Sequence, residues 1–321
     1  MAGYYVGVDL GGTFIKAVVM NGSFKSVRKN AAQTQYKETA GVVLFQIIRL
    51  IEELLLSANI KKAEVAGIGI GVPGITDNVK NTAVVVPNLR WHDVPVGDII
   101  GKHFGIPVFV ENDGSVNALG EMYAGAGKGF KDIILITLGT HLGSGIIVNG
   151  RLLGGASNFA GETGHMIIQA DGEPCVCGNK GCFGSYCSAE AMIRTANALK
   201  PEYPDSALFR YTKGKFEEAT AEMISTGFDE GDTLCIKVME KTAKYLSIGL
   251  ANLIHLFNPE IIIIGGGVSN AGRRLLDPVR EQVKRYLMHP RQNCLIEKAK
   301  LGSDAGMLGA AILSSLKTAN A

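Results

Sequence analysis

The chain has 321 residues, 46% of them hydrophobic and 19% charged, which is typical of a globular protein of two domains. Its formal net charge is only +2, so nothing in its electrostatics favours binding to nucleic acid or to an anionic membrane. No signal peptide is evident, and the apolar runs are far shorter than the ~20 residues that cross a bilayer. We therefore expect a cytoplasmic protein with small-molecule partners.

The first predicted elements are strands at 4–10 and 14–20, joined by a turn of Gly11, Gly12 and Thr13. Glycine in such a turn lets backbone N–H groups approach an anion that a side chain would hold off. Asp9 lies near the end of the first strand, where it is placed to address a metal ion carried by that anion. An ordinary hairpin has the same pattern, so both interpretations are open at this point.

An α/β pattern continues downstream, with a helix at 39–57, strands at 65–71 and 108–111, and a helix at 114–124. The strand at 108–111 stops at Asn112 and Asp113. Ligand groups of α/β sheets typically lie at such carboxyl ends of strands. These two residues are therefore candidates for binding or catalysis.

A second glycine-turned hairpin is predicted further along, formed by a strand at 133–138, a turn with Gly139 and Thr140, and a strand at 146–148. It repeats the opening pattern, which indicates two related halves. Two such hairpins facing one cleft would hold the phosphates of a nucleotide from both sides. A later strand at 261–264 runs into three glycines, where we expect the nucleoside: Gly265, Gly266 and Gly267.

The strongest local signal is the spacing of one histidine and three cysteines, His165-x9-Cys175-x-Cys177-x4-Cys182. Three thiolates and an imidazole can close a tetrahedral Zn2+ site with no position left for water. Cysteines clustered in this way within a reducing compartment favour metal binding over disulfides. We therefore expect a structural Zn2+ that fixes a loop.

Taken in order, these motifs resemble those of the ROK family of sugar kinases and sugar-responsive repressors. The matching segments are Asp9-Leu10-Gly11-Gly12-Thr13, Glu111-Asn112-Asp113, Leu138-Gly139-Thr140, Gly161-Glu162-Thr163-Gly164-His165, Cys175-Val176-Cys177-Gly178-Asn179-Lys180-Gly181-Cys182 and Gly265-Gly266-Gly267. The resemblance covers nearly the whole chain. It implies an actin-like ATPase (ribonuclease H-like) fold with two α/β domains around a cleft.

The resemblance also suggests the domain limits. Residues 1–116, completed by a C-terminal helix at 305–321, would form the smaller domain, and residues 117–304 would form the larger domain with the zinc loop. A homodimer is expected. No nucleic-acid or membrane partner is expected.

The implied activity is ATP-dependent phosphorylation of a hexose, of the glucokinase type and at the 6-hydroxyl. A sugar hydroxyl is a poor nucleophile until a carboxylate takes its proton, and Asp113 is the candidate base. From the residues alone, capping the following helix is the commoner role of such an aspartate, and it is the resemblance that favours the base. The resemblance implies that the sugar contacts Asn88, Asn112, Asp113, Glu162 and His165, with one ring nitrogen of His165 on zinc and the other on the sugar.

For the nucleotide, the resemblance implies that Asp9 positions Mg2+. The ATP contacts are expected from Gly11, Gly12, Thr13, Lys16, Gly139, Thr140, Gly265, Gly266 and Gly267. Lys16 has a simple alternative, because a lysine in a strand can equally be a solvated charge.

Two positions depart from the family pattern. Kinases of the family usually continue the cysteine motif with a glutamate that binds sugar hydroxyls, but this chain has Gly184 at that position. The hexose therefore stays open between glucose and alternatives such as allose, N-acetylmannosamine, fructose or a glucoside. The second departure is His141, where the phosphate turn usually has glycine.

The family that the chain resembles also includes sugar-responsive repressors. A repressor of the family would carry a helix-turn-helix segment before the first strand, and only eight residues precede Asp9, so we do not expect a repressor. A sugar sensor without catalysis and a phosphotransferase of the same fold with a non-sugar substrate stay open.

Overall fold

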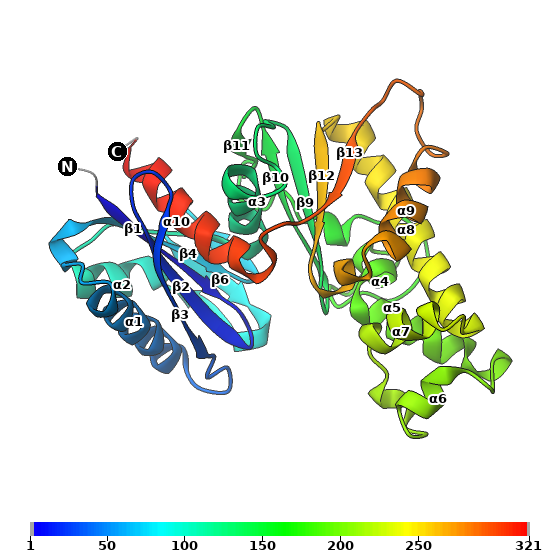
Figure 1. Ribbon diagram of the computed structural model, residues 1–321. Coiled ribbons are helices and arrows are strands. Elements are labelled where there is room, and N and C mark those ends of the chain that lie inside the picture. Colours follow the sequence, from blue (N-terminus) through cyan, green and yellow to red (C-terminus); the bar gives the residue numbers. More distant parts are fainter. Residues whose placement is uncertain (1–2, 320–321) are drawn as a thin grey trace. The chain divides into compact units, whose positions relative to one another are not determined.

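The structure, a computed structural model, describes residues 3–319. The chain divides into two compact units (Figure 1). Unit 1 contains the chain up to Lys131, residues 145–161 and the chain from Lys300 onward, and unit 2 contains Asp132–Ser144 and Glu162–Ala299. The expected domain limits stay a prediction, because a division by compactness does not say which segment folds alone.

The main sheet of unit 1 has the strand order β3-β2-β1-β4-β8. Its strands are β1 (Tyr4–Leu10), β2 (Phe14–Met20), β3 (Ser26–Gln33), β4 (Val65–Val72) and β8 (Val108–Asn112). The β1–β2 hairpin is antiparallel, whereas β1, β4 and β8 run parallel. The predicted strands at 4–10, 14–20, 65–71 and 108–111 are thereby confirmed.

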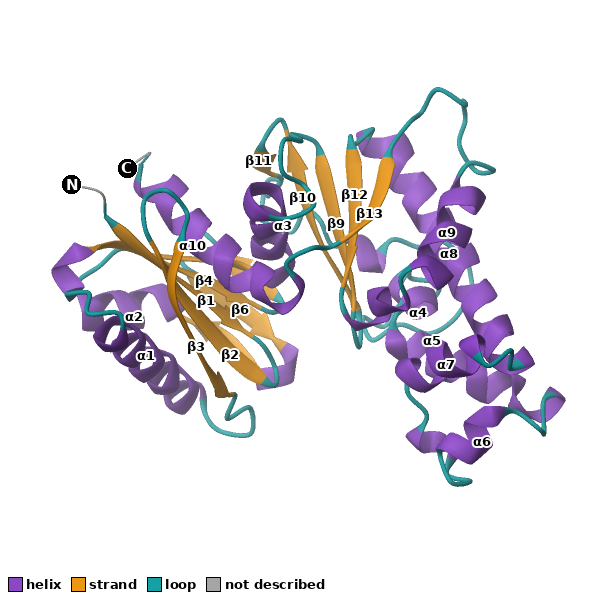
Figure 2. Ribbon diagram, in the orientation of Figure 1, coloured by secondary structure: helices purple, strands orange, loops and turns teal. Residues whose placement is uncertain are grey.

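Helices pack on this sheet (Figures 1 and 2). α1 (Ala40–Ser57) packs along β2 and β3, α2 (Val96–Phe104) packs against β8, and α3 (Asp113–Ala124) packs against α10 (Ala305–Thr318). A separate small sheet contains β5 (Ile75–Asp77), β6 (Thr82–Val86) and β7 (Trp91–Val94). The predicted helices at 39–57 and 114–124 are confirmed as α1 and α3.

Glycines allow α10 to lie directly on β1 and β4. A Cβ atom added at Gly7 would stand 2.0 Å from the carbonyl oxygen of Met307, and one at Gly69 would stand 1.8 Å from that of Ala310. No side chain fits in such a space, so these positions require glycine if the helix is to touch the sheet. The last helix is thus packed against some of the first strands of the chain.

The second sheet has the order β11-β10-β9-β12-β13. Its strands are β9 (Ile133–Leu138), β10 (Leu142–Val148), β11 (Arg151–Leu152), β12 (Ile261–Gly265) and β13 (Leu295–Lys298). β12 runs parallel to both β9 and β13, and all five of its residues are buried. Continuous apolar runs of this kind are typical of parallel strands covered on both faces.

Unit 2 is rich in helices outside its strands (Figure 2). They are α4 (Gly184–Cys187), α5 (Ala189–Leu199), α6 (Ala207–Tyr211), α7 (Ala221–Asp229), α8 (Thr233–Phe257) and α9 (Arg273–Val283). α8 packs against α5, α7 and α9. Within residues 3–319, no helix combines the length and apolar character needed to span a membrane.

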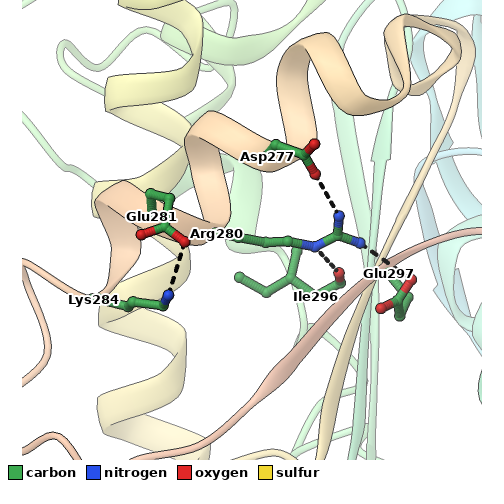
Figure 3. Close-up of polar contacts among 6 residues, drawn as sticks. All are labelled: Asp277, Arg280, Glu281, Lys284, Ile296 and Glu297. Atoms are coloured by element: carbon green, nitrogen blue, oxygen red, sulfur yellow. Dashed lines mark hydrogen bonds and ion pairs between the residues drawn. The ribbon is translucent and has the colours of Figure 1, made fainter.

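Arg280 fastens α9 to the edge strand β13 (Figure 3). Its Nε donates to the carbonyl oxygen of Ile296 at 2.8 Å, while its two terminal nitrogens reach Asp277 at 2.8 Å and Glu297 at 3.2 Å. The bond to a backbone carbonyl fixes the helix to the strand. A neighbouring pair of Lys284 and Glu281 is exposed, and such surface pairs add little stability.

Candidate functional site

The first candidate phosphate site is the turn between β1 and β2. Gly11 is required by the turn itself, because its N–H donates to Phe14 O and an added Cβ would lie 2.8 Å from that oxygen. Gly12 is different: an added Cβ would meet no atom within 4 Å, and its φ lies outside the left-handed region. Among the described residues, neither packing nor backbone conformation requires glycine at this position, which suits the approach of a ligand to the backbone. The neighbouring Thr13 is exposed.

The contacts of an added Cβ atom also divide the predicted nucleotide-binding glycines of unit 2 into packed and open positions. Gly266 has φ +81° and is packed against Leu138 O, so the backbone itself requires glycine. An added Cβ at Gly265 would meet the side chain of Ala299 at 3.4 Å. Gly267 has no atom within 4 Å of an added Cβ, and Gly139 has only His141 O at 3.7 Å. Gly139 and Gly267 therefore offer open backbone, and Thr140 beside Gly139 is exposed.

Asp9 lies close to the N-terminus of α10, where Gly306 leaves room for its carboxylate. A Cβ at Gly306 would stand 2.5 Å from Asp9 Cγ. Burial and the nearby charge of Asp113 raise the pKa of Asp9 to about 7, while Lys16 opposes the shift. A bound divalent cation would favour the ionised form of such a carboxyl group.

Lys16, which was expected near the phosphates, has a protein partner. Its Nζ donates to the carbonyl oxygen of Ser303 at 3.0 Å, just before α10. This contact ties β2 to the segment that leads into the helix. A contact of Lys16 with ATP stays a prediction.

Asn112 and Asp113 stand where β8 ends and α3 begins. Asn112 caps the helix: its Oδ1 accepts from Ser115 N at 3.2 Å, and its Nδ2 donates to Gly74 O at 2.9 Å. Asp113 is the first residue of the helix, and its Oδ1 accepts from Gly114 N at 2.8 Å. The alternative in which Asp113 is the cap is therefore wrong, and its carboxylate lies at the positive end of the helix dipole.

Sequence reasoning missed the buried contact that supports this segment. Glu111 is only 8% exposed, and its two oxygens accept from Asn112 N at 2.9 Å and from Asn78 Nδ2 at 3.0 Å. The sequence indicates Glu111 only as part of a motif and Asn78 only as part of a turn, and nothing in it pairs the two residues. No local sequence pattern predicts the contact between Glu111 and Asn78, because 33 residues separate them.

Three further sugar-contact candidates are exposed. Asn88 lies in a short 3-10 turn at Pro87–Leu89 of unit 1. In unit 2, Glu162 and His165 are exposed on either side of Thr163 and Gly164, which are buried. The N–H and the hydroxyl of Thr163 both lie within hydrogen-bond distance of Ser144 Oγ, at 3.2 and 2.8 Å. This contact fixes the segment and leaves its two candidate side chains accessible.

His165, Cys175, Cys177 and Cys182 come together in unit 2, with their ligand atoms all within 4.8 Å of one another. His165 Nδ1 lies 3.5 Å from Cys175 Sγ, and the sulfurs of Cys177 and Cys182 are 3.7 Å apart. Zinc–ligand bonds of about 2.0–2.3 Å in a tetrahedron put ligands roughly 3.6–3.8 Å from one another. The four residues therefore fit a tetrahedral Zn2+, with Nε2 of His165 left free.

The thiols of this cluster differ in acidity. The backbone N–H of Asn179 is the main cause that lowers the pKa of Cys177 to about 6, whereas burial raises that of Cys182 to about 12. Zinc needs all three sulfurs as thiolates, so its binding would release protons.

The zinc loop is also held by contacts that need no metal. Arg194 of α5 donates to Ser185 O and, at 3.1 Å, to Glu173 Oε2. The hydroxyl of Tyr186 accepts from Glu173 N at 2.8 Å, and that of Ser185 donates to Pro174 O at 3.1 Å. The loop is thus partly organised by the protein itself.

The ROK family model matches residues 5–317. The chain belongs to the ROK family. It is 36% identical to a glucokinase of Halalkalibacterium halodurans, over 95% of this chain and 93% of the relative. It is also 32% identical to a xylose repressor of Caldicellulosiruptor bescii, over 96% of this chain and 77% of the repressor.

Solved structures agree with this ROK assignment. A ROK family glucokinase from Streptomyces griseus, in complex with glucose and AMPPNP, is 34% identical with a TM-score of 0.83, covering 98% of this chain and 100% of that one. A ROK hexokinase from Thermus thermophilus is 30% identical with a TM-score of 0.85, covering 99% and 100%. The expected α/β, actin-like ATPase fold is confirmed.

Gly184, where a departure from the family pattern is expected, is the first residue of α4. An added Cβ there would lie 3.3 Å from Leu142 Cβ and 3.4 Å from Gly164 O. The backbone at this position is closely packed, so a longer side chain needs a small shift of Leu142. Further along, at the start of α5, Glu190 has its Oε2 3.5 Å from His141 Nδ1.

Proposed function

We propose that this chain transfers the γ-phosphoryl group of ATP to a hexose, as a kinase of the glucokinase type acting on the 6-hydroxyl. The observation that carries the proposal is the relation of Asp9 to Asp113. These carboxylates lie at the carboxyl ends of two strands of one parallel set and interact electrostatically. Asp9 is suited to hold a metal ion, and Asp113 is suited to accept the proton of a reacting hydroxyl. The glucokinase relatives support this assignment.

Asp113 acts as the general base that takes the proton of the sugar hydroxyl. Its position at the start of α3, with Asn112 capping the helix, fixes the direction of the carboxylate. Asp9 would hold Mg2+, which supplies positive charge to the phosphates when bound. The open backbone at Gly12, Gly139 and Gly267 supports contacts with ATP, together with Thr13 and Thr140.

The sugar is held by Asn88, Asn112, Glu162 and His165. The ring of His165 supports a double role, because Nδ1 lies 3.5 Å from Cys175 Sγ and zinc there would leave Nε2 for the sugar. Zinc on Nδ1 would fix the tautomer with the proton on Nε2, which can then donate to a sugar hydroxyl.

We also propose one structural Zn2+ per chain, a homodimer and a cytoplasmic location. The zinc is supported by the spacing of the four ligand atoms. The homodimer and the location are supported only by the family resemblance and by the composition of the chain.

A coupled assay of ADP release tests the activity. Purified protein with Mg2+ and ATP is offered glucose, mannose, allose, fructose, N-acetylglucosamine and N-acetylmannosamine, and the product is checked for a phosphate on O6. Turnover with at least one hexose is expected. Saturable sugar binding without ADP release would instead support a sugar sensor, a possibility kept open by the xylose repressor among the relatives.

A further inference from the structure

The turn between β9 and β10 carries a histidine at its tip. The side chain of His141 is 51% exposed, and its Nδ1 lies 3.5 Å from Oε2 of Glu190, which is 52% exposed. The N–H of Gly139 donates to the carbonyl oxygen of His141 at 3.0 Å and so closes the turn. His141 is therefore placed beside the open backbone of Gly139, with one ring nitrogen facing a carboxylate.

The arrangement is fixed by the beginning of α5. Ala189 N donates to Gly139 O at 2.9 Å, and the hydroxyl of Ser188 caps the helix by accepting from Ala191 N at 3.2 Å. The turn is thereby joined to the first turn of the helix, which carries Glu190. The pair of His141 and Glu190 is set by backbone contacts on both sides.

The charge of Glu190 needs compensation if Gly139 and Thr140 bind phosphate. A carboxylate close to a polyphosphate repels it, whereas a cationic imidazole between the two anions attracts both. In that form both ring nitrogens donate. With Nδ1 directed to Glu190, Nε2 is the ring atom left for a second anion.

We propose that His141 binds a phosphate group of the nucleotide through Nε2 and that Glu190 orients the ring. The inference rests on the proposed function and deepens it, since it adds a nucleotide contact at a position where the resembling kinases have glycine. Glu190 is a positioning residue that acts through His141.

The test compares five variants with the wild type. His141→Ala removes the donor, and His141→Gln replaces it with an amide that can reach a similar position. The double variant His141→Ala, Glu190→Gln removes the donor and also the repelling charge, and Glu190→Gln alone removes the carboxylate that orients the ring. His103→Ala is the matched control, because His103 on α2 forms a similarly exposed pair with Glu52 on α1.

Two measurements are made on each variant: the Kd of Mg2+-AMPPNP by calorimetry, and kcat with KM for ATP and for the best hexose. A hydrogen bond to a charged group contributes about 1.5–3 kcal/mol, so His141→Ala should raise Kd and KM for ATP roughly tenfold or more. The hexose KM and kcat should change less than about twofold. His141→Gln and the double variant should each recover part of the affinity, and His103→Ala should bind like the wild type.

The outcomes separate this inference from the proposed function. If wild-type and His141→Ala proteins bind AMPPNP equally, the role of His141 is overturned, whether or not a hexose is phosphorylated. If Glu190→Gln brings no recovery in the His141→Ala background, the repulsion between Glu190 and the phosphates is overturned. If Glu190→Gln alone leaves the Kd of AMPPNP unchanged while His141→Ala raises it, the orienting role of Glu190 is overturned. If no hexose is turned over but His141→Ala weakens AMPPNP binding, the kinase proposal fails and the phosphate contact stands. A wild type that binds no nucleotide overturns both.

Discussion

At the scale of single residues, the glycines of the candidate nucleotide turns fall into two groups. Gly11 and Gly266 are required by close packing or by a left-handed backbone, whereas Gly12, Gly139 and Gly267 have neither reason. A glycine that the fold does not require still lowers the stability of the folded state, because it gives the unfolded chain more conformational entropy to lose. Ligand access to the backbone is a physical reason to keep it. The sequence pattern alone did not distinguish the two groups.

The substitution Asp113→Asn should abolish phosphoryl transfer while sugar binding persists. The amide keeps the shape of the carboxylate but cannot accept the proton, and loss of a general base costs roughly 10²–10⁴-fold in kcat. Steady-state assays and calorimetric titration with the best sugar measure the two effects. Wild-type turnover by the variant would show that another group is the base.

Asp9 should make the stability of metal-free protein depend on pH. Its folded pKa of about 7 lies above the unfolded value of 3.8, so the folded state holds the proton more tightly. The stabilisation from this group is present below about pH 4 and is lost as pH rises toward 7. One pKa unit is worth about 1.4 kcal/mol, which sets a ceiling of about 4 kcal/mol for the total change.

Urea unfolding in EDTA at several pH values between 4.5 and 8 measures this change, with Asp9→Asn as the reference. The difference in unfolding free energy between wild type and variant should fall across this range and level off above pH 7. A constant difference would mean that the carboxyl group titrates normally.

The substitution Gly184→Glu tests the missing sugar acceptor. A hydrogen bond to a charged acceptor contributes on the order of 1.5–3 kcal/mol, so the glutamate should raise kcat/KM for glucose relative to sugars altered at C1 or C2. Gly184→Ala is the control, because it introduces only the tight contacts to Leu142 and Gly164. If the glutamate variant is worse than the alanine variant with every sugar, another residue supplies the contact.

At the scale of elements, the proposed zinc site and the proposed sugar contacts share His165. Cys177→Ala should lose most of the bound zinc, about one ion per chain in the wild type, and should weaken sugar affinity more than ATP affinity. Arg194 and Tyr186 hold part of the loop without metal, so the variant should stay folded. Elemental analysis, thermal unfolding and calorimetry with each substrate provide the measurements. Zinc-free protein with full activity and unchanged stability would contradict the structural role.

The elements that sequence reasoning found are those with strong local patterns. Apolar strands such as β1 and β12 were predicted within a residue or two, because buried parallel strands read as continuous hydrophobic runs. β3 was missed because most of its residues are exposed and it contains Arg28, Lys29 and Asn30, as suits an edge strand. The three short strands β5–β7 were also missed. Their pairing depends on contacts that no window of the sequence contains.

The candidate site was predictable to a similar degree. The motif residues are evident in the sequence, and the four proposed zinc ligands come together as their spacing predicts. The supporting partners were not named, since Asn78, Arg194 and Ser303 are recognised only once the chain is folded. Sequence spacing thus located the chemical groups, while long-range hydrogen bonds decide their orientation.

At the scale of the whole molecule, the chain returns to unit 1 at Lys300, where its backbone donates to a buried glutamate side chain. Glu121 of α3 is fully buried and accepts from the N–H groups of Ala126, Lys300 and Leu301, at 2.7, 3.2 and 2.8 Å. A buried charge satisfied by three backbone donors fixes the returning chain at that point. The segment that follows leads directly into α10.

The position of α10 has a consequence for how the protein is made. On the ribosome, β1 and β4 emerge long before α10. The face of these strands that α10 covers, which contains Gly7 and Gly69, therefore lacks its helix while unit 2 is synthesised. Domains usually fold in the order in which they are translated. Here α10 must be synthesised before unit 1 is complete, and unit 2 can fold while unit 1 is still incomplete. Until then, the nascent chain exposes apolar sheet surface that a chaperone can bind.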